Sequence, residues 1–198
     1  MGTEQLYVVY DKQCIREDSV IYLKQIKKRL QNIIEITVEN ICEIPEQASY
    51  LYLKSTSKKR DEEIKNYLKN KNLNNIEFDK DGISITAEAI LKVLKQFGNI
   101  KDKLITIVNQ SEEVGKSLAI YLIKNGYNVA SINSKINKSA IENISLSTNI
   151  LILAAENFRY KQDELCEPQI VIDISNSTDN DILAIKYIPT IEVLKKRI

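Results

Sequence analysis

The sequence predicts an α/β protein whose second half folds as a Rossmann-like, doubly wound parallel sheet. The first observation is a set of continuous apolar runs, which suit parallel strands covered on both faces: Leu104–Val108, Val129–Ile132, Ile150–Ala154 and Ile170–Ile174. The second is a stripe of apolar residues at helical spacing between the first two runs, ending at Asn125-Gly126. Strands and helices that alternate in this way are typical of a doubly wound sheet.

The first half predicts a smaller, truncated α/β domain. Leu6–Tyr10 is rich in β-forming residues and indicates a strand, and Glu17–Ile33 has the apolar spacing of a helix. Glu35–Ile44 alternates and indicates a second strand. Pro45 suits the first turn of a helix, where its missing N–H is not needed. We expect that helix, or a pair of helices, to carry the apolar residues Tyr52, Leu53, Ile64, Tyr67 and Leu68.

A polar stretch, Asn70–Gly82, separates the two halves. After it, Thr86 suits the N-cap position of a helix whose apolar stripe stops at Gly98. We therefore expect three parts in chain order: an α/β domain over residues 1–85, a Rossmann-type domain over residues 86–188, and a C-terminal helix over residues 189–198 that packs back on the first domain.

The composition excludes several classes of function. The chain has 198 residues, with 28 Lys plus Arg against 27 Asp plus Glu, so its net charge of +1 gives no general attraction to nucleic acid or anionic membranes. It contains no histidine, which removes His-dependent nucleophile pairs and His-ligated zinc. The cysteines are scattered, so they favour neither a disulfide framework nor a Cys-only zinc site: Cys14, Cys42 and Cys166. We expect no metal.

The expected location is the cytoplasm. The first residues lack the basic leader and the small-residue cleavage site of a signal peptide. No apolar stretch approaches the roughly 18 residues that a membrane-spanning helix needs. We therefore expect neither a membrane nor a nucleic-acid partner.

A candidate phosphate loop, Asn109–Ser117, directly follows the first strand of the second half, where a Rossmann domain places a pyrophosphate. The usual G-x-G-x-x-G pattern is absent and only Gly115 remains. Asn109 stands at the first glycine and can take that glycine's left-handed conformation, although less freely. Glu112 and Glu113 bring negative charge, but acids also suit a helix N-terminus that binds nothing. A phosphate site and an ordinary capped helix start both stay open.

An ordered set of segments between Thr86 and Asp173 resembles the methylenetetrahydrofolate dehydrogenase/cyclohydrolase family. In that family T-P-x-G-I precedes a helix, G-K precedes a strand, and the nucleotide loop is G-R-S-x-x-V-G-K-P. The family continues with His-Ser-Lys, Ala-Asp-Ile and a P-G-x-V-V-I-D strand. The similar segments here are, in chain order, Thr86–Phe97, Lys101–Lys103, Ile105–Asn109, Ser111, Val114–Lys116, Ala119–Gly126, Asn133–Lys135, Thr148–Leu151 and Pro168–Asp173.

The resemblance implies a nicotinamide nucleotide, a folate substrate and a homodimer built around the nucleotide domain. Two loop residues depart from the family, Gln110 for its arginine and Asn109 for its first glycine, and Glu156 replaces a glycine after the third strand. No acid ends the second strand to bind a ribose 2′-hydroxyl, which favours NADP over NAD. The implied nucleotide-binding positions are Asn109, Gln110, Ser111, Val114, Gly115, Lys116, Asn133, Ser134 and Lys135.

The resemblance also implies catalytic positions in the first half, where it is less clear. Asp11–Leu30 is similar to the family's opening strand and helix, and Ala48–Tyr52 resembles the A-S-x-x-Y start of its catalytic helix. The family's catalytic lysine lies four residues after Tyr52, where this chain has Thr56. A threonine cannot carry a cation or act as a base near neutral pH. Asp81 stands where a remnant of the family's D-V-D-G segment would lie.

Other family segments are reduced. The glutamine-bearing L-V-Q-L-P-L-P strand has no counterpart, and the P-G-G-V-G-P-M loop is shortened to Ile188–Ile191. Three interpretations follow. The first is that the chain is a non-catalytic relative that acts as a binding or assembly protein. Alternatively, it is an NADP-dependent 5,10-methylenetetrahydrofolate dehydrogenase of one-carbon metabolism that retains nicotinamide binding. The third is a partner-binding module that uses the basic C-terminal helix Ile191–Ile198, with Lys195, Lys196 and Arg197.

Overall fold

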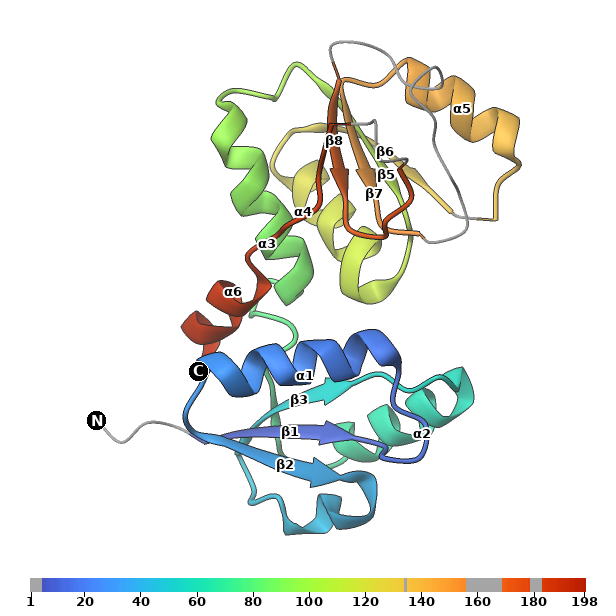
Figure 1. The fold of residues 1–198 in the computed structure, drawn as a ribbon. Helices are drawn as coiled ribbons and strands as arrows, with labels where there is room; N and C mark the ends of the chain where they lie inside the picture. Colours follow the sequence, from blue (N-terminus) through green and yellow to red (C-terminus); the bar gives the residue numbers. More distant parts are fainter. Residues whose placement is uncertain (1–4, 134, 156–168, 179–182) are drawn as a thin grey trace. The chain divides into compact units, whose positions relative to one another are not determined.

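The computed structural model of the chain describes residues 5–133, 135–155, 169–178 and 183–198. The chain divides into two compact units (Figure 1): Met1–Asp79 together with Ile191–Ile198, and Lys80–Thr190. Each unit is built on its own parallel sheet, so the predicted α/β class is confirmed. In the described ranges, every helix is too short or too polar to span a bilayer.

The first unit holds a four-stranded sheet in the order β2-β1-β3-β4. Its strands are β1 (Leu6–Tyr10), β2 (Ile33–Thr37), β3 (Ser49–Leu53) and β4 (Asn74–Asn75). Two helices connect them, α1 (Glu17–Arg29) after β1 and α2 (Lys58–Lys69) after β3. Because these two crossovers run in opposite directions along the sheet, right-handed connections place α1 and α2 on opposite faces (Figure 1).

Two predictions for the first unit are wrong. The second strand ends at Thr37 and is followed by a short 3₁₀ helix, Val38–Glu43. The segment after Pro45 forms β3 rather than a helix, because its Tyr-Leu alternation buries Tyr50 on one face and Leu51 and Leu53 on the other. Pro45 instead opens a turn, in which the Pro45 carbonyl accepts from the Ala48 N–H at 3.3 Å.

The predicted apolar helix therefore begins only after β3. The Ser57 hydroxyl accepts from the Arg60 N–H at 3.3 Å and caps the start of α2. Ile64 and Leu68 of α2 pack against Tyr7 and Val9 of β1 in the core of that face.

The C-terminal helix α6 (Thr190–Arg197) buries three apolar residues, Ile191, Val193 and Leu194. From Ile191 onward it belongs to the first unit. The Arg197 guanidinium donates to the carbonyls of Ile76 and Glu77 at 3.2 and 2.8 Å, just after β4. One of the three basic residues proposed as a docking surface is therefore used inside the unit, whereas Lys195 and Lys196 are exposed.

The second unit contains a five-stranded parallel sheet in the order β6-β5-β7-β8-β9. Its strands are β5 (Leu104–Val108), β6 (Asn128–Ile132), β7 (Ile150–Leu153), β8 (Ile170–Asp173) and β9 (Ala184–Ile185). The helices are α3 (Ile85–Leu94), α4 (Ser117–Lys124) and α5 (Lys138–Leu146). The four predicted strands are thus confirmed, and side chains on both faces of β5 and β7 are buried.

The N-cap of α3 is Ser84 and not Thr86, which lies inside the helix. The Ser84 hydroxyl accepts from the Ala87 N–H at 3.0 Å and donates to the carbonyl of Glu113. The Ser84 N–H donates to the Ser117 hydroxyl at 2.9 Å. Ser84 is better placed than Thr86 because it is fully buried at the junction of α3 with the turn that leads into α4.

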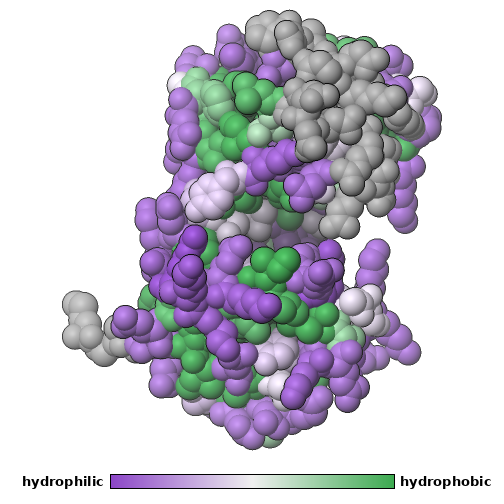
Figure 2. Space-filling view, viewed as in Figure 1, coloured by the Kyte–Doolittle hydropathy of each residue, from purple (hydrophilic) through white to green (hydrophobic). Residues whose placement is uncertain are grey.

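Hydrophilic side chains form most of the surface of both units on the face drawn in Figure 2, and the apolar patches between them are small. Single exposed apolar residues are ordinary on a folded domain.

Candidate functional site

A ligand crevice in a doubly wound sheet is expected where neighbouring strands lead to helices on opposite sides, at the carboxyl ends of the strands. In the second unit this point lies between β5 and β7, because β6 pairs with one edge of β5 and β7 with the other. The candidate loop leaves the carboxyl end of β5 at Asn109, and Ala154 follows β7. The sequence-predicted nucleotide loop therefore stands at the expected crevice.

The side chain of Asn109 crosses this crevice. Its Nδ2 donates to the carbonyl oxygen of Ala154 at 2.6 Å, and its Oδ1 accepts from the Ser111 N–H at 2.6 Å. The expectation that Asn109 takes a glycine-like conformation is wrong, because Gln47 and Asn176 are the non-glycine residues with positive φ in the described chain. Asn109 instead uses its carboxamide, and the Ser111 N–H, a donor that could face an anion, already has an acceptor.

Gly115 is a position where the turn packs directly against the backbone of Asn109. A Cβ added there would lie 1.8 Å from the backbone oxygen of Asn109 and 2.4 Å from its carbonyl carbon. Real Cβ atoms do not approach backbone so closely, so a glycine is required at 115 whether or not a ligand binds. The turn Glu112–Lys116 is a single π turn that leads into α4, and the Lys116 N–H donates to the Ser111 carbonyl at 3.0 Å.

The charges of the loop pair with each other. The Lys116 ammonium forms an ion pair with Glu112, one helical turn away, and both side chains are more than half exposed. An exposed pair of this kind adds at most about 1 kcal/mol to stability. Val114 faces inward and packs against the core of the second unit. Of the expected nucleotide contacts, Lys116 is therefore already partnered and Val114 is a core residue.

The remaining expected contacts either reach β6 from the loop, as Gln110 does, or follow β6 directly. Gln110 Nε2 donates to the carbonyl and to the hydroxyl oxygen of Ser131, at 3.1 and 3.3 Å. Asn133 Oδ1 accepts from the N–H of Lys135 at 2.9 Å, and the Lys135 side chain is exposed. Ser134, Glu156, Cys166 and Pro168 lie outside the described residues.

Tyr52, expected on a catalytic helix, lies on β3, and α2 begins after Thr56. The Tyr52 hydroxyl donates to Asp61 Oδ1 at 2.8 Å, and the same oxygen accepts from the Ser55 N–H at 2.8 Å. Burial and then the bond to Asp61 raise the pKa of Tyr52 well above its usual range. The phenol is therefore a fixed neutral donor that supports the start of α2. Thr56 is exposed.

The Ser-x-x-Tyr spacing of the family's helix occurs a second time, on α1. Ser19 and Tyr22 lie in the first turns of this helix, which directly follows the opening strand. Four residues after Tyr22 stands Ile26, which is fully buried. The order of elements could have located the motif. The family carries it on a helix, and the segment Ala48–Tyr52 forms the strand β3, whereas Ser19 and Tyr22 lie on the helix α1. Asp81 is exposed and belongs to the other unit.

The corresponding crevice of the first sheet lies between β1 and β3, and backbone hydrogen bonds join the loops on its two sides. Backbone bonds join the loop after β1 to the end of β3, from Thr56 N–H to the Cys14 carbonyl at 2.7 Å and from Arg16 N–H to the Lys54 carbonyl at 3.2 Å. Beneath them Asp11 is buried and pairs with Arg60 at 2.9 Å.

The bond from Arg60 lowers the pKa of Asp11, although burial opposes it. Burial raises the pKa of the Cys14 thiol, which argues against a reactive thiolate there. In the described part of the chain, no three Cys, Asp or Glu side chains are grouped so as to hold a metal ion.

Asp173, at the end of β8, is also a structural carboxylate. It is fully buried, and its two oxygens accept from Ser175 and from both the N–H and the hydroxyl of Thr178, at 2.7 to 3.2 Å. Burial alone would raise its pKa, but a bond from the Ser177 backbone, together with those from Thr178 and Ser175, outweighs burial and lowers the pKa. Its role is to fold the turn after β8.

These features define the class of the protein: two parallel α/β units, the second a Rossmann-type unit with a glycine-anchored loop at its crevice. Residues 84–185 match the model of the tetrahydrofolate dehydrogenase/cyclohydrolase NAD(P)-binding domain. The chain belongs to this family.

Curated relatives agree with this assignment. The bifunctional protein FolD of Thermotoga petrophila is 31% identical over 90 residues, which is 45% of this chain and 33% of that protein. FolD of Clostridium botulinum strain Okra is 31% identical over 108 residues, or 53% of this chain and 38% of the relative. The matched part thus spans only about a third of the length of these relatives.

Solved structures show the same fold over nearly the whole chain. The bifunctional 5,10-methylenetetrahydrofolate dehydrogenase/cyclohydrolase of Thermoplasma acidophilum has a TM-score of 0.72 at 17% identity, covering 99% of this chain and 88% of that one. The enzyme of Trypanosoma brucei, solved with NADP and an inhibitor, has a TM-score of 0.72 at 17% identity, covering 98% and 84%. Both sheets of this chain therefore have counterparts in that fold.

Proposed function

We propose that this chain is a non-catalytic member of the family that acts as a binding or assembly protein. The observation that carries the proposal is the Asn109 side chain, which bridges the crevice to the Ala154 carbonyl. A pyrophosphate in this crevice needs close approach to the backbone and open N–H donors at the helix start. Here the Asn109 side chain lies across the crevice, and the Ser111 N–H already donates to Asn109 Oδ1.

The charge of the loop supports the same proposal. Glu112 stands in the first turn after Ser111, and it pairs with Lys116, the lysine of the loop. A nucleotide would have to compete with Glu112 for this ammonium. The arginine of the family's loop is Gln110 here, which carries no charge and bonds to Ser131.

The first unit supports loss of the folate chemistry. On α1, the position one turn after Tyr22 is the buried Ile26, and on β3 the position four residues after Tyr52 is Thr56. Neither alignment supplies a lysine, and neither side chain can transfer a proton near neutral pH.

The direct test combines binding and turnover. Purified chain is titrated with NADP and NAD by calorimetry, and NADP-dependent oxidation of 5,10-methylenetetrahydrofolate is followed by absorbance. We expect no saturable heat and no oxidation above a protein-free blank. Oxidation that rises in proportion to the protein concentration and co-purifies with it would overturn the proposal.

A second candidate is an NADP-dependent methylenetetrahydrofolate dehydrogenase that retains its nucleotide. The observation in its favour lies after β6, which is followed by the uncharged Asn133 and not by an acid, and the exposed Lys135 lies two residues later. Without an acid to bind a ribose 2′-hydroxyl, a 2′-phosphate meets no repulsion there. Tighter binding of NADP than of NAD, lost in Lys135→Gln, is the result that favours this candidate.

We also propose a homodimer, on the strength of the family relationship. Light scattering coupled to size-exclusion chromatography distinguishes a 22.7 kDa monomer from a particle of twice that mass. A monomer at all concentrations tested would remove the homodimer from the account and leave binding to other proteins.

A further inference from the structure

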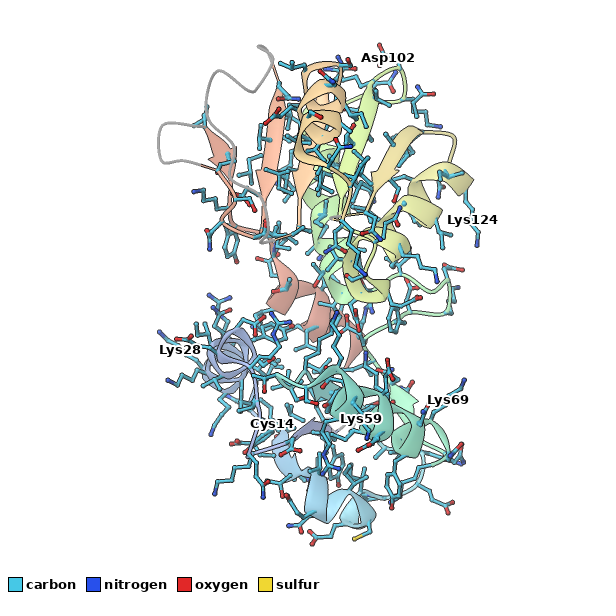
Figure 3. All side chains as sticks on the ribbon, turned by 90° about the vertical axis from the view of Figure 1, so that its right-hand side faces the viewer. Cys14, Lys28, Lys59, Lys69, Asp102 and Lys124 are labelled. Carbon is cyan, nitrogen blue, oxygen red and sulfur yellow. The ribbon has the colours of Figure 1, made fainter. Side chains whose placement is uncertain are left out.

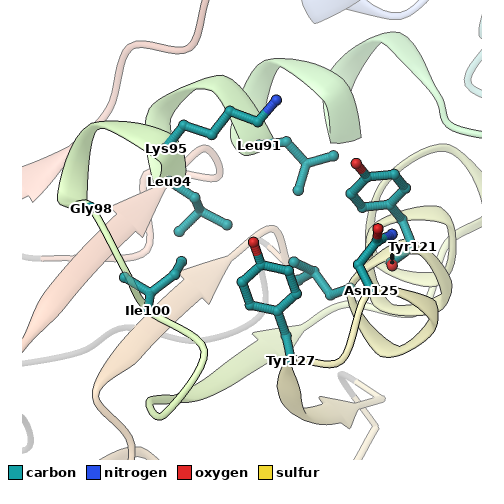
Figure 4. A pocket seen from close by; sticks show the side chains of 9 residues that line it. Leu91, Leu94, Lys95, Gly98, Ile100, Tyr121, Asn125 and Tyr127 are labelled. Atoms are coloured by element: carbon teal, nitrogen blue, oxygen red, sulfur yellow. Dashed lines mark hydrogen bonds between the residues drawn. The ribbon is translucent and has the colours of Figure 1, made fainter.

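The second unit contains a cavity of about 120 Å³ that no part of the nucleotide site uses (Figure 4). It lies between the end of α3, the end of α4 and the segments that lead into β5 and β6. Ile100 and Tyr127 come just before these two strands, so the cavity is at their amino ends. The candidate nucleotide loop leaves the opposite end of β5, a five-residue strand about 16 Å long.

The floor of the cavity is apolar. Leu94 and Leu122 are 2% and 1% exposed, and Ile100 is 4% exposed. Leu91 from α3 completes this floor (Figure 4). Gly98 also lines the cavity, and because it has no side chain only backbone faces the space there. An apolar ring fits such a floor by contact alone.

The rim is polar, and its charge has one sign. The Lys95 ammonium and the hydroxyls of Tyr121 and Tyr127 stand around the floor (Figure 4). None of these three groups has a hydrogen-bond or ion-pair partner within the described ranges. The side-chain amide of Asn125 is used, since it donates to the Tyr121 carbonyl at 2.8 Å. Among the described residues, none that lines the cavity is acidic.

A second cation lies beside one wall. The Lys101 ammonium is 5.8 Å from the centre of the Tyr127 ring. It adds positive potential at the amino ends of β5 and β6 without entering the cavity, since Lys101 is not among the lining residues. The surroundings therefore favour an anion over a cation.

We propose that this cavity is a binding site for a small monocyclic aromatic carboxylate. The ring lies on the leucine floor between the two tyrosine rings, and the carboxylate accepts from Lys95 and a tyrosine hydroxyl. The volume limits the ligand to a single ring, because a closed apolar cavity of roughly 150 Å³ holds one benzene ring. This cavity, at about 120 Å³, is open at its rim, where the carboxylate lies. A dinucleotide is far larger than this space, so the site is separate from the nucleotide loop and independent of the proposed function.

The test uses 4-hydroxybenzoate as the probe and the full chain labelled with ¹⁵N. Binding is followed by the amide shifts of Gly98, Ile100 and Tyr127, and 4-hydroxybenzyl alcohol supplies the same ring without the charge. Lys95→Gln removes the proposed anion contact. Lys124→Gln is the matched control, because Lys124 is exposed on α4 and does not line the cavity (Figure 3).

We expect saturable shifts at these amides with 4-hydroxybenzoate, about tenfold weaker binding in Lys95→Gln and unchanged binding in Lys124→Gln. Absence of saturable shifts up to millimolar concentrations would remove the site. Equal affinity for the alcohol, or an affinity that Lys95→Gln leaves unchanged, would overturn the carboxylate class.

Discussion

The side-chain amide of Asn109 lies across the crevice of the second sheet and donates to the Ala154 carbonyl at 2.6 Å. The two residues leave neighbouring parallel strands, β5 and β7, at the point where a doubly wound sheet binds its ligand. A single side chain therefore joins the two sides of the crevice, and its Oδ1 also accepts the hydrogen bond from the Ser111 N–H.

Replacing Asn109 with glycine tests this arrangement. The substitution removes both hydrogen bonds and restores the backbone freedom that lets a phosphate approach. We expect saturable NADP binding to appear in calorimetry at concentrations where the unmodified chain gives none, which requires a gain of about tenfold or more, or about 1.4 kcal/mol.

Asn99→Gly is the matched control for that variant. Asn99 makes the same local turn, accepting from the Lys101 N–H two residues later at 3.2 Å, but it lies before the amino end of β5, away from the crevice. Equal effects of the two glycine variants on NADP affinity would show that Asn109 does not close the crevice.

Gly115→Ala should destabilise the second unit. The new Cβ would meet the Asn109 backbone oxygen at 1.8 Å, so the helix and the loop must separate. We expect a loss of about 3 kcal/mol in the free energy of unfolding, measured by urea denaturation. Gly126→Ala, where φ is +77° but the space is open, should cost only about 1–2 kcal/mol. The reverse order would contradict the close contact at Gly115.

Acid stability should depend on Asp11. Its pKa is lowered in the folded protein by Arg60, so the ion pair contributes stability above the unfolded pKa of about 3.9. That contribution is lost as the pH falls through the folded pKa. We expect Asp11→Asn to lower stability at neutral pH and to flatten the acid limb of a plot of unfolding free energy against pH. Asp18→Asn, at an exposed pair with Arg16, should leave the limb unchanged.

Tyr52→Phe tests whether Tyr52 is structural. The variant loses the bond to Asp61, which still accepts from the Ser55 N–H, so we expect a loss of about 1 kcal/mol of stability. NADP and folate binding, measured by calorimetry, should be unchanged. A change in folate affinity without a change in stability would instead make Tyr52 part of a ligand site.

The second sheet could be predicted from sequence because its strands are buried on both faces. Runs such as Leu104–Val108 and Ile150–Leu153 leave no helical or half-exposed alternative of the same length. The sequence gives conflicting signals for β3. Pro45 and the A-S-x-x-Y match both favour a helix, whereas the alternation of tyrosine and leucine from Tyr50 to Leu53 favours the strand that forms.

The closing of the crevice could not be predicted, because it depends on a contact between residues 45 positions apart. The sequence identified Asn109 as a departure from glycine but gave only its backbone preference, not the partner of its carboxamide. Likewise, the cap at Ser84 depends on Glu113 and Ser117, which only the packed turn brings within reach.

Calorimetric titration of the unmodified chain with NADP, with Asn109→Gly measured beside it, tests the central claim most directly. The account predicts no saturable heat for the unmodified chain and measurable binding once Asn109 is glycine. Micromolar binding of NADP by the unmodified chain would show that the Asn109 bridge does not prevent nucleotide entry, and would contradict the account.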